Sequence, residues 1–256
     1  MDQSVCSNNN NSHAPPQGLR RVLVSETLLM QDKYRFIGPV YDLLSTLYSG
    51  KTIQHCKVAN VNPENIRPGD KVLFAGVGHG RDALAAAALG AEVTVVDLSE
   101  TMLRKFAETQ ASEGPDVEIQ SIHSDIMKVD HPGQYDVVVA NFFLNVFQEQ
   151  QMQEVLSHLI SQIRPGGQLI IGDFCYPTGN ILSQWIRKAY WYAALGTFWL
   201  LANNPMHKIY NYPDYVSGMG LQIQDRKQFR LMGMDCYWSI LARKPEAGEF
   251  SQTANS

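Results

Sequence analysis

The sequence predicts an α/β protein built around a mostly parallel sheet, and two observations lead to this prediction. The first is a short apolar stretch that ends in three glycines spaced by two, Gly76, Gly78 and Gly80. An alanine-rich helical segment follows over residues 82–89. The second is another apolar stretch, residues 93–96, which ends in Asp97. A strand, a glycine-rich turn, a helix and a second strand ending in an acid form the start of a nucleotide-binding unit.

Each part of this unit has a physical reason. Glycine lets the backbone turn tightly and approach a ligand where a Cβ would collide. The first N–H groups of the helix have no partner within the helix, so they face the ligand. Gly90 suits the C-terminal cap of that helix. Asp97 stands where a carboxylate holds both ribose hydroxyls of a nucleotide.

Later segments supply further elements. Ser99 is a candidate N-cap for a helix, because its hydroxyl can accept from an unpaired N–H. Apolar residues recur at helical spacing over residues 152–163, which predicts an amphipathic helix packed on the sheet. A third strand is expected to end at residues 122–125, and a fourth is expected at 135–140. Residues 163–171 are expected to form the turn into a fifth strand, and the last two strands are expected at 221–224 and 236–242.

The order of these segments resembles class I S-adenosylmethionine (SAM) methyltransferases over residues 36–244. Nicotinamide and flavin enzymes want glycine or alanine three residues after the second glycine, where this chain has Arg81. The resemblance implies a Rossmann-like fold with a seven-stranded, mostly parallel sheet and an antiparallel last strand. It also implies an N-terminal lid helix and a helical cover between strands five and six, at about residues 176–215.

The resemblance further implies the cofactor site. In the family the glycines cradle the methionine portion of SAM, the acid at position 97 binds the ribose, and the acid at 125 contacts the adenine amine. The cofactor-binding residues carried over are Gly76, Gly78, His79, Gly80, Asp97, Leu98, Asp125, Ile126, Asn141 and Phe142. No metal is implied.

The chain departs from the family at one position of the cofactor site. The family usually carries an acid just before the first glycine, where it contacts the amine of SAM, and here that residue is Ala75. A neighbour such as His79, Arg81 or Asn141 supplies the missing polar contact, or the affinity for SAM is weakened, or a SAM-like site serves another use.

The N-terminal segment points to an acceptor class. Its Tyr41-Asp42 pair, followed by Ser49-Gly50, resembles the start of the ubiquinone/menaquinone C-methyltransferases, and bacterial phosphatidylethanolamine N-methyltransferases begin in a similar way. Tyr41 would help to close a lid that excludes water from the reaction. Asn145-Val146 also matches the quinone enzymes, but Leu144 replaces their arginine, which puts a quinone acceptor in question.

An aromatic stretch at residues 189–202 is the other unusual feature. At about fourteen residues it is shorter than the roughly twenty that cross a bilayer. It is either a buried helix of the cover, a lining for an apolar acceptor, or a surface that rests on a membrane with its basic flank toward lipid headgroups. His207 follows it and is the candidate general base if the acceptor must lose a proton.

Bulk properties set the remaining limits. The 256 residues suit one domain, residues 19–244, between polar tails at 1–18 and 245–256 that we expect to be disordered. A net charge of −4 without a dense basic stretch argues against nucleic acid as a substrate. The four scattered cysteines and the lack of a signal pattern predict reduced thiols in a cytoplasmic protein, with peripheral membrane contact through 189–202 as a further option.

The sequence therefore predicts a SAM-dependent methyltransferase of the EC 2.1.1 class. Its acceptor would be small and apolar, such as a quinone-like ring, a phenol or a lipid headgroup, and Tyr41 and His207 are the candidate catalytic residues. One alternative is a SAM-binding protein of the same fold without methyl transfer. Another is a dehydrogenase on a related sheet. The oligomeric state is open.

Overall fold

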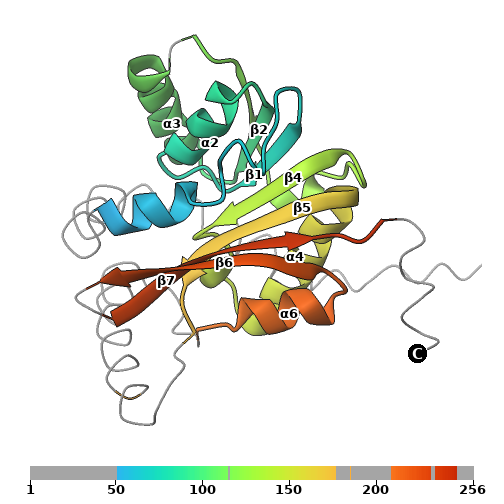
Figure 1. Ribbon diagram of the computed structural model, residues 1–256. Helices are drawn as coiled ribbons and strands as arrows, with labels where there is room; N and C mark the ends of the chain where they lie inside the picture. Colours follow the sequence, from blue (N-terminus) through green and yellow to red (C-terminus); the bar gives the residue numbers. More distant parts are fainter. Residues whose placement is uncertain (1–50, 115, 177–184, 186–208, 232–233, 247–256) are drawn as a thin grey trace, which may run out of the picture.

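Seven strands form a single sheet in the order β3-β2-β1-β4-β5-β7-β6 (Figure 1). The computed structural model describes residues 51–114, 116–176, 185, 209–231 and 234–246. The strands are β1 (Lys71–Ala75), β2 (Glu92–Asp97), β3 (Ile119–His123), β4 (Tyr135–Asn141), β5 (Ile163–Phe174), β6 (Gln222–Leu231) and β7 (Met234–Arg243). Only β7 runs antiparallel to its neighbours, β5 and β6. The mostly parallel sheet expected from the sequence is therefore confirmed.

Helices cover both faces of the sheet, as the alternation of side chains along β1 requires. Leu73 and Ala75 join one apolar cluster with residues of α4 and α6, while Val72 and Phe74 join another with residues of α2 and α3. The helical elements are residues 51–58, α2 (Arg81–Ala88), α3 (Glu100–Glu113), η1 (Ile126–Lys128), η2 (Leu144–Val146), α4 (Glu149–Gln162) and α6 (Tyr212–Gly218).

The predicted ends of the first two helices are confirmed. Ser99 caps α3, because its side chain accepts a hydrogen bond from the backbone N–H of Met102 at 3.3 Å. Gly90 has a φ of 87° and lies directly after Leu89, the C-cap of α2. Ser99 at the start of α3 and Gly90 after the end of α2 act through local contacts alone. The sequence therefore predicts both helix ends correctly.

The start of β5 differs from the expected turn. Residues 163–167 were predicted to lead into the strand, yet β5 already begins at Ile163, which pairs with Tyr135 of β4. The N–H of Gly166 bonds to the carbonyl of Lys244, and the N–H of Lys244 bonds to the carbonyl of Gly167. These bonds extend the sheet pairing through the segment, so Ile163 belongs to the strand and not to the helix before it.

The segment before β1 packs on the other end of the chain. Cys56 donates its thiol hydrogen to the carbonyl of Trp238 at 3.1 Å, and the side-chain amide of Asn60 donates to Ser239 Oγ at 3.1 Å. Lys227 Nζ also donates to the carbonyl of Ala59 at 3.0 Å. Residues 51–60 are thereby attached to β6 and β7.

Several predicted segments lie outside the described residues: the lid helix, the aromatic stretch 189–202 and most of both tails. Pro245 and Glu246 are described, however, and the Gly166 N–H approaches the Pro245 carbonyl at 3.4 Å. Residues 245 and 246 thus lie next to the turn at Gly166. Within the described ranges, no helix has the length and apolar character needed to cross a membrane.

Candidate functional site

The sheet order reverses between β1 and β4, which lie side by side in its centre. In open α/β sheets, ligands bind in the crevice at the carboxyl ends of the strands where this reversal occurs. The loop at residues 76–80 leaves β1 at that edge, and residues 142–143 leave β4 beside it. The glycine loop and Phe142 therefore leave neighbouring strands at the same edge of the sheet, where a crevice between β1 and β4 is expected.

The three glycines of the loop have different neighbours. All have positive φ, between 52° and 74°. A Cβ on Gly80 would overlap the ring of Phe106, and one on Gly76 would stand 2.7 Å from the ring of Phe143. A Cβ on Gly78 would meet only Lys57 Nζ, at 3.4 Å. Gly76 and Gly80 are thus needed by the protein's own packing, whereas Gly78 leaves space that a ligand can occupy.

Asp97 holds the glycine loop in place. Its Oδ2 accepts from the N–H of Val77 at 2.9 Å, and its Oδ1 accepts from the N–H of Ser99 at 2.8 Å. Burial raises the pKa of Asp97, and these two N–H groups oppose that rise. One carboxylate therefore joins the loops after β1 and β2, and each of its oxygens keeps a further lone pair.

Asp125, Leu98 and Ile126 lie near Asp97, at the ends of β2 and β3. Asp125 caps η1, because its Oδ1 accepts from the N–H of Met127 at 3.0 Å. Leu98 bonds through its carbonyl to His123 Nε2 at 3.0 Å, and Ile126 is buried. The strand pairing of Asp97 with His123 brings this group to the same edge of the sheet as the glycine loop.

His79 and Arg81 face the end of α3. The Arg81 guanidinium makes a two-nitrogen contact with the Glu113 carboxylate, at 2.6 to 3.0 Å. This hydrogen bond, with a smaller contribution from His79, lowers the pKa of Glu113. Both His79 and Arg81 are exposed. The suggestion that Arg81 compensates for Ala75 is not supported, because its guanidinium is already bound at the surface.

Asn141 connects three elements at the crevice. Its side-chain amide donates to Asp82 Oδ2 at 2.8 Å and to the carbonyl of Lys57 at 3.0 Å. Asn141 Oδ1 is buried without a hydrogen-bond partner among the described residues and lies against Gly172, where a Cβ would approach it to 2.5 Å. Asn141 was expected to offer its amide to a ligand, but both amide hydrogens are used within the protein.

Asp82 was missed by the sequence reasoning. It lies in the first turn of α2, is 4% exposed, and stands beside the glycine loop. An acid directly after Arg81, at the start of the helix that follows the glycine loop, is the signal that could have found it. Ala75, by contrast, is fully buried within β1 and offers no polar side chain.

Phe142 begins an aromatic wall next to the crevice. Its φ of 53° is unusual for a bulky residue and marks local backbone strain. Its N–H bonds to the carbonyl of Gly172 at 2.6 Å, which helps to hold this conformation. Its ring meets those of Phe174 and Tyr237 edge-on, with centroids 5.6 and 5.7 Å away. Phe142, Phe174 and Tyr237 thus form an aromatic cluster beside the end of β4.

Asp173, at the end of β5, is a second missed carboxylate. It is fully buried and accepts three hydrogen bonds, from Asn145 Nδ2 at 2.8 Å, the Phe174 N–H at 2.7 Å and the Tyr212 hydroxyl at 2.9 Å. Burial raises the pKa of Asp173 to about 7 against the effect of these donors. Asp173 could have been predicted from the sequence, because it is an acid near the end of an apolar strand, as Asp97 is.

Tyr210 and Tyr212 are both buried. Tyr212 is the first residue of α6, and the Tyr210 hydroxyl donates to the carbonyl of Phe147 at 2.9 Å. The chain therefore packs into the core just before α6 begins. The two predicted catalytic residues, Tyr41 and His207, lie outside the described residues.

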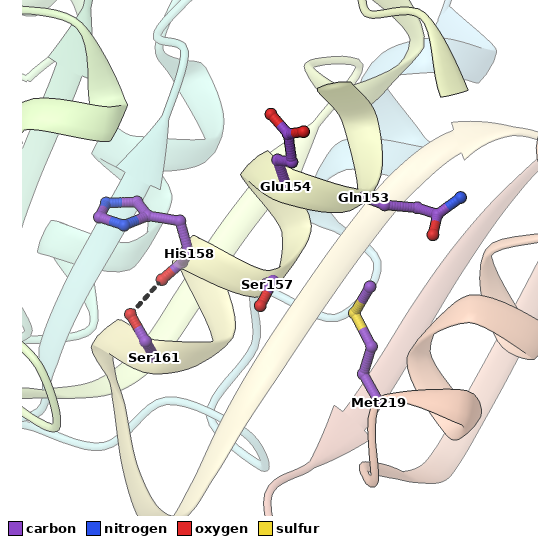
Figure 2. Close-up of a pocket in the computed structure, with 6 residues that line it drawn as sticks. All are labelled: Gln153, Glu154, Ser157, His158, Ser161 and Met219. Carbon is purple, nitrogen blue, oxygen red and sulfur yellow. Dashed lines mark hydrogen bonds between the residues drawn. The ribbon is translucent and has the colours of Figure 1, made fainter. Parts of the chain in front are cut away.

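Two surface pockets lie along α4 and α6. One, of about 740 Å³, is lined by Tyr176, Tyr210, Tyr215 and Met219 among others. The other, of about 580 Å³, lies on α4 next to Met219 (Figure 2). There the imidazole of His158 points away from Met219, and its Nε2 lies 3.0 Å from two backbone carbonyls. Neither pocket includes residues of the glycine loop.

Comparison with known proteins finds similar methyltransferases. Residues 72–167 match the model of a methyltransferase domain. The ubiquinone/menaquinone biosynthesis C-methyltransferase of Ectopseudomonas mendocina is 24% identical over 155 residues, 59% of this chain and 60% of that protein. The enzyme of the same name from Azotobacter vinelandii is 24% identical over 165 residues, 62% of this chain and 64% of that protein. The chain thus matches less than two thirds of the length of these relatives.

Solved structures agree on the fold. Magnesium protoporphyrin IX methyltransferase from Synechocystis, with bound S-adenosylhomocysteine, has a TM-score of 0.64 and 18% identity, covering 85% of this chain and 99% of its own. The 1,6-didemethyltoxoflavin-N1-methyltransferase from Burkholderia thailandensis has a TM-score of 0.59 and 17% identity, covering 93% and 94%. The chain therefore has the Rossmann-like fold of class I SAM methyltransferases and resembles the ubiquinone/menaquinone C-methyltransferases.

Proposed function

We propose that this protein is a SAM-dependent methyltransferase that moves a methyl group from SAM to a small, apolar acceptor. The observation that carries the proposal is the position of Asp97, whose carboxylate braces the glycine loop at the crevice between β1 and β4. That arrangement suits a nucleoside whose ribose hydroxyls meet a carboxylate. The methyltransferase-domain match spans the same residues, 72–167.

The residues around the loop fit SAM. Gly78 leaves room for a close approach, and each Asp97 oxygen can accept one more hydrogen bond from a ribose hydroxyl. When bound, SAM supplies a methyl group made electrophilic by its sulfonium. The glycine loop would hold the methionyl portion, and Asp125 would accept from the adenine amine between Leu98 and Ile126.

The protein's own part in such a transfer is to position the acceptor and to exclude water. Asn141 holds the crevice together, and Phe142 would edge the channel along which the methyl group moves. Tyr41 would help to close the lid. His207 would take the proton if the acceptor is a phenol or a carbon acid.

The acceptor class follows from the aromatic wall of Phe142, Phe174 and Tyr237, which favours an apolar molecule. The names of the similar proteins refer to quinone biosynthesis, toxoflavin and protoporphyrin, and all of these are ring compounds. A quinone-like ring, a phenol or a lipid headgroup would fit, in the cytoplasm or at a membrane touched by residues 189–202. The net charge of −4 disfavours nucleic acid.

A SAM-binding protein without transfer is the second candidate, and Ala75 is the observation that favours it. Without an acid at that position, the methionyl end has one fewer partner in the loop, so binding could persist while the reacting geometry is lost. A dehydrogenase is disfavoured by Arg81, which stands where the dinucleotide loop requires a small residue.

Calorimetric titration with SAM and S-adenosylhomocysteine tests the proposal. Wild type should bind both with micromolar affinity, and Asp97→Ala should weaken binding about 100-fold or more, because two hydrogen bonds to a charged group are lost. The exposed Asp130, replaced by alanine, is the control and should bind as wild type does. If the wild type binds neither ligand, the methyltransferase function is refuted and only the assignment of the fold remains. Binding without transfer to quinol, phenol or amine acceptors would favour the second candidate.

A further inference from the structure

Two charged side chains, Lys57 and Asp82, lie next to the glycine loop without an ion pair among the described residues. Lys57 Nζ lies over the loop, 3.4 Å from where a Cβ of Gly78 would be and 5.9 Å from the centroid of the Phe142 ring. Asp82 lies at the start of α2, which leaves the loop. Among the described residues, ion pairs join other side chains, and neither Lys57 nor Asp82 takes part in one.

The carboxylate of Asp82 is buried, so a cation or further hydrogen-bond donors would stabilise it. Its side chain is 4% exposed, and the amide of Asn141 is its one hydrogen-bond donor among the described residues. A carboxylate removed from water is stable when it is paired with a cation or fully hydrogen-bonded. One neutral amide leaves most of its acceptor sites unused, so a cationic group brought into the crevice would be stabilised there.

Asn141 fixes the direction of this carboxylate. Its amide nitrogen lies between two acceptors, Asp82 Oδ2 and the Lys57 carbonyl, so the amide cannot be turned to place its oxygen there. The same side chain thereby fixes both the carboxylate and the backbone that carries the Lys57 ammonium. Asn141 thereby links the carboxylate of Asp82 to the backbone of Lys57 near the loop.

We propose that Asp82 binds the α-ammonium group and Lys57 the α-carboxylate of the methionyl end of SAM. An α-amino acid carries one charge of each sign on one carbon, and Lys57 and Asp82 offer one charge of each sign next to the loop. Asp82 thus takes the part of the acid that is missing at position 75, and Lys57 adds a cation. This inference rests on the proposed function, since it concerns how the same cofactor is held.

Three ligands can distinguish the contact of Asp82 from the contact of Lys57. SAM carries both charged groups, decarboxylated SAM lacks the carboxylate, and 5′-methylthioadenosine lacks both. Asp82→Asn keeps an oxygen for the Asn141 hydrogen bond and should weaken SAM and decarboxylated SAM about 10- to 100-fold, leaving methylthioadenosine unchanged. Lys57→Met keeps most of the side chain's length and should weaken SAM alone by about 10-fold, because its contact is half-exposed.

The measurement is calorimetric titration of each variant, with thermal unfolding and methylthioadenosine binding as checks that the fold is intact. An equal loss for all three ligands would make Asp82 a structural residue and overturn the proposal. Unchanged SAM affinity in Asp82→Asn would overturn it as well. Wild type that binds neither SAM nor methylthioadenosine would instead refute the proposed function, so the two failures are distinguishable.

Discussion

Asp97 and Asp173 are carboxylates near the carboxyl ends of parallel strands, Asp97 partly buried and Asp173 fully buried, but they are held in different ways. Asp97 accepts from two backbone N–H groups, those of Val77 and Ser99. Asp173 accepts from the side chains of Asn145 and Tyr212 as well as from the next N–H. Burial raises the pKa of both carboxyls.

The two carboxylates therefore depend on different kinds of contact. The position of Asp97 depends on backbone loops, so it is sensitive to changes in loop conformation. The position of Asp173 depends on side chains from η2 and α6, so it is sensitive to single side-chain deletions and to pH. Three variants can test this contrast through protein stability.

The largest effect should come from Gly80→Ala, in the loop that Asp97 braces. The new Cβ would overlap Phe106, which is buried in the core, and the backbone would be strained at a φ of 68°. We expect a loss of about 4 kcal/mol in the free energy of unfolding, measured by urea titration.

Gly133→Ala is the matched control, because Gly133 has a φ of 70° and a Cβ at this position would meet no atom of the described residues within 4 Å. It should lose only the cost of backbone strain, about 1 kcal/mol. Equal losses for Gly80→Ala and Gly133→Ala would show that the contact with Phe106 is easily relieved, and that the loop is less tightly packed than its geometry indicates.

The next effect is a pH dependence that comes from Asp173. Its pKa is raised from 3.8 to about 7 in the folded protein, so the folded state binds this proton more tightly than the unfolded state does. The resulting stabilisation is complete below pH 3.8 and is lost as the pH rises through about 7. Between about pH 5 and 8 the loss should be about 2 to 3 kcal/mol.

Asp173→Asn should remove this fall in stability, because an asparagine oxygen can accept from Asn145 and Phe174 while its amide donates to the Tyr212 hydroxyl. Asp97→Asn is the matched control and should leave the fall in place. The measurement is the free energy of unfolding of the wild type and both variants, from urea titrations at several pH values. A fall of the same size in Asp173→Asn would assign the pH dependence to other groups.

The smallest effect should come from Tyr212→Phe, which removes the donor to Asp173 Oδ2. We expect a loss of about 1.5 kcal/mol at pH 8, where the carboxylate is charged. Tyr210→Phe removes a bond to the neutral carbonyl of Phe147 and should cost less. If the two variants lose the same free energy of unfolding, the charge of Asp173 contributes nothing to its bond with Tyr212.

The parts predicted correctly from the sequence are those with local causes. The glycine loop, Asp97 and the Ser99 cap interact within about twenty residues of one another, and the strand pattern follows from apolar runs. The missed features depend on distant partners. Asp82 and Asn141 are 59 positions apart, and Asp173 and Tyr212 are 39 apart. A sequence pattern does not reveal such pairs until the sheet order brings them together.

The attachment of residues 51–60 to β6 and β7 has a consequence for synthesis. Cys56 and Asn60 bond to residues 182 and 179 positions later, and Lys227 reaches Ala59 across 168 positions. A growing chain exposes β1 and the glycine loop early, but the helical segment that carries Lys57 gains its bonds to Trp238 and Ser239 only when both residues have left the ribosome. A nascent chain that stalls before β7 therefore holds this segment by fewer contacts, such as the bond from Asn141 to the Lys57 carbonyl.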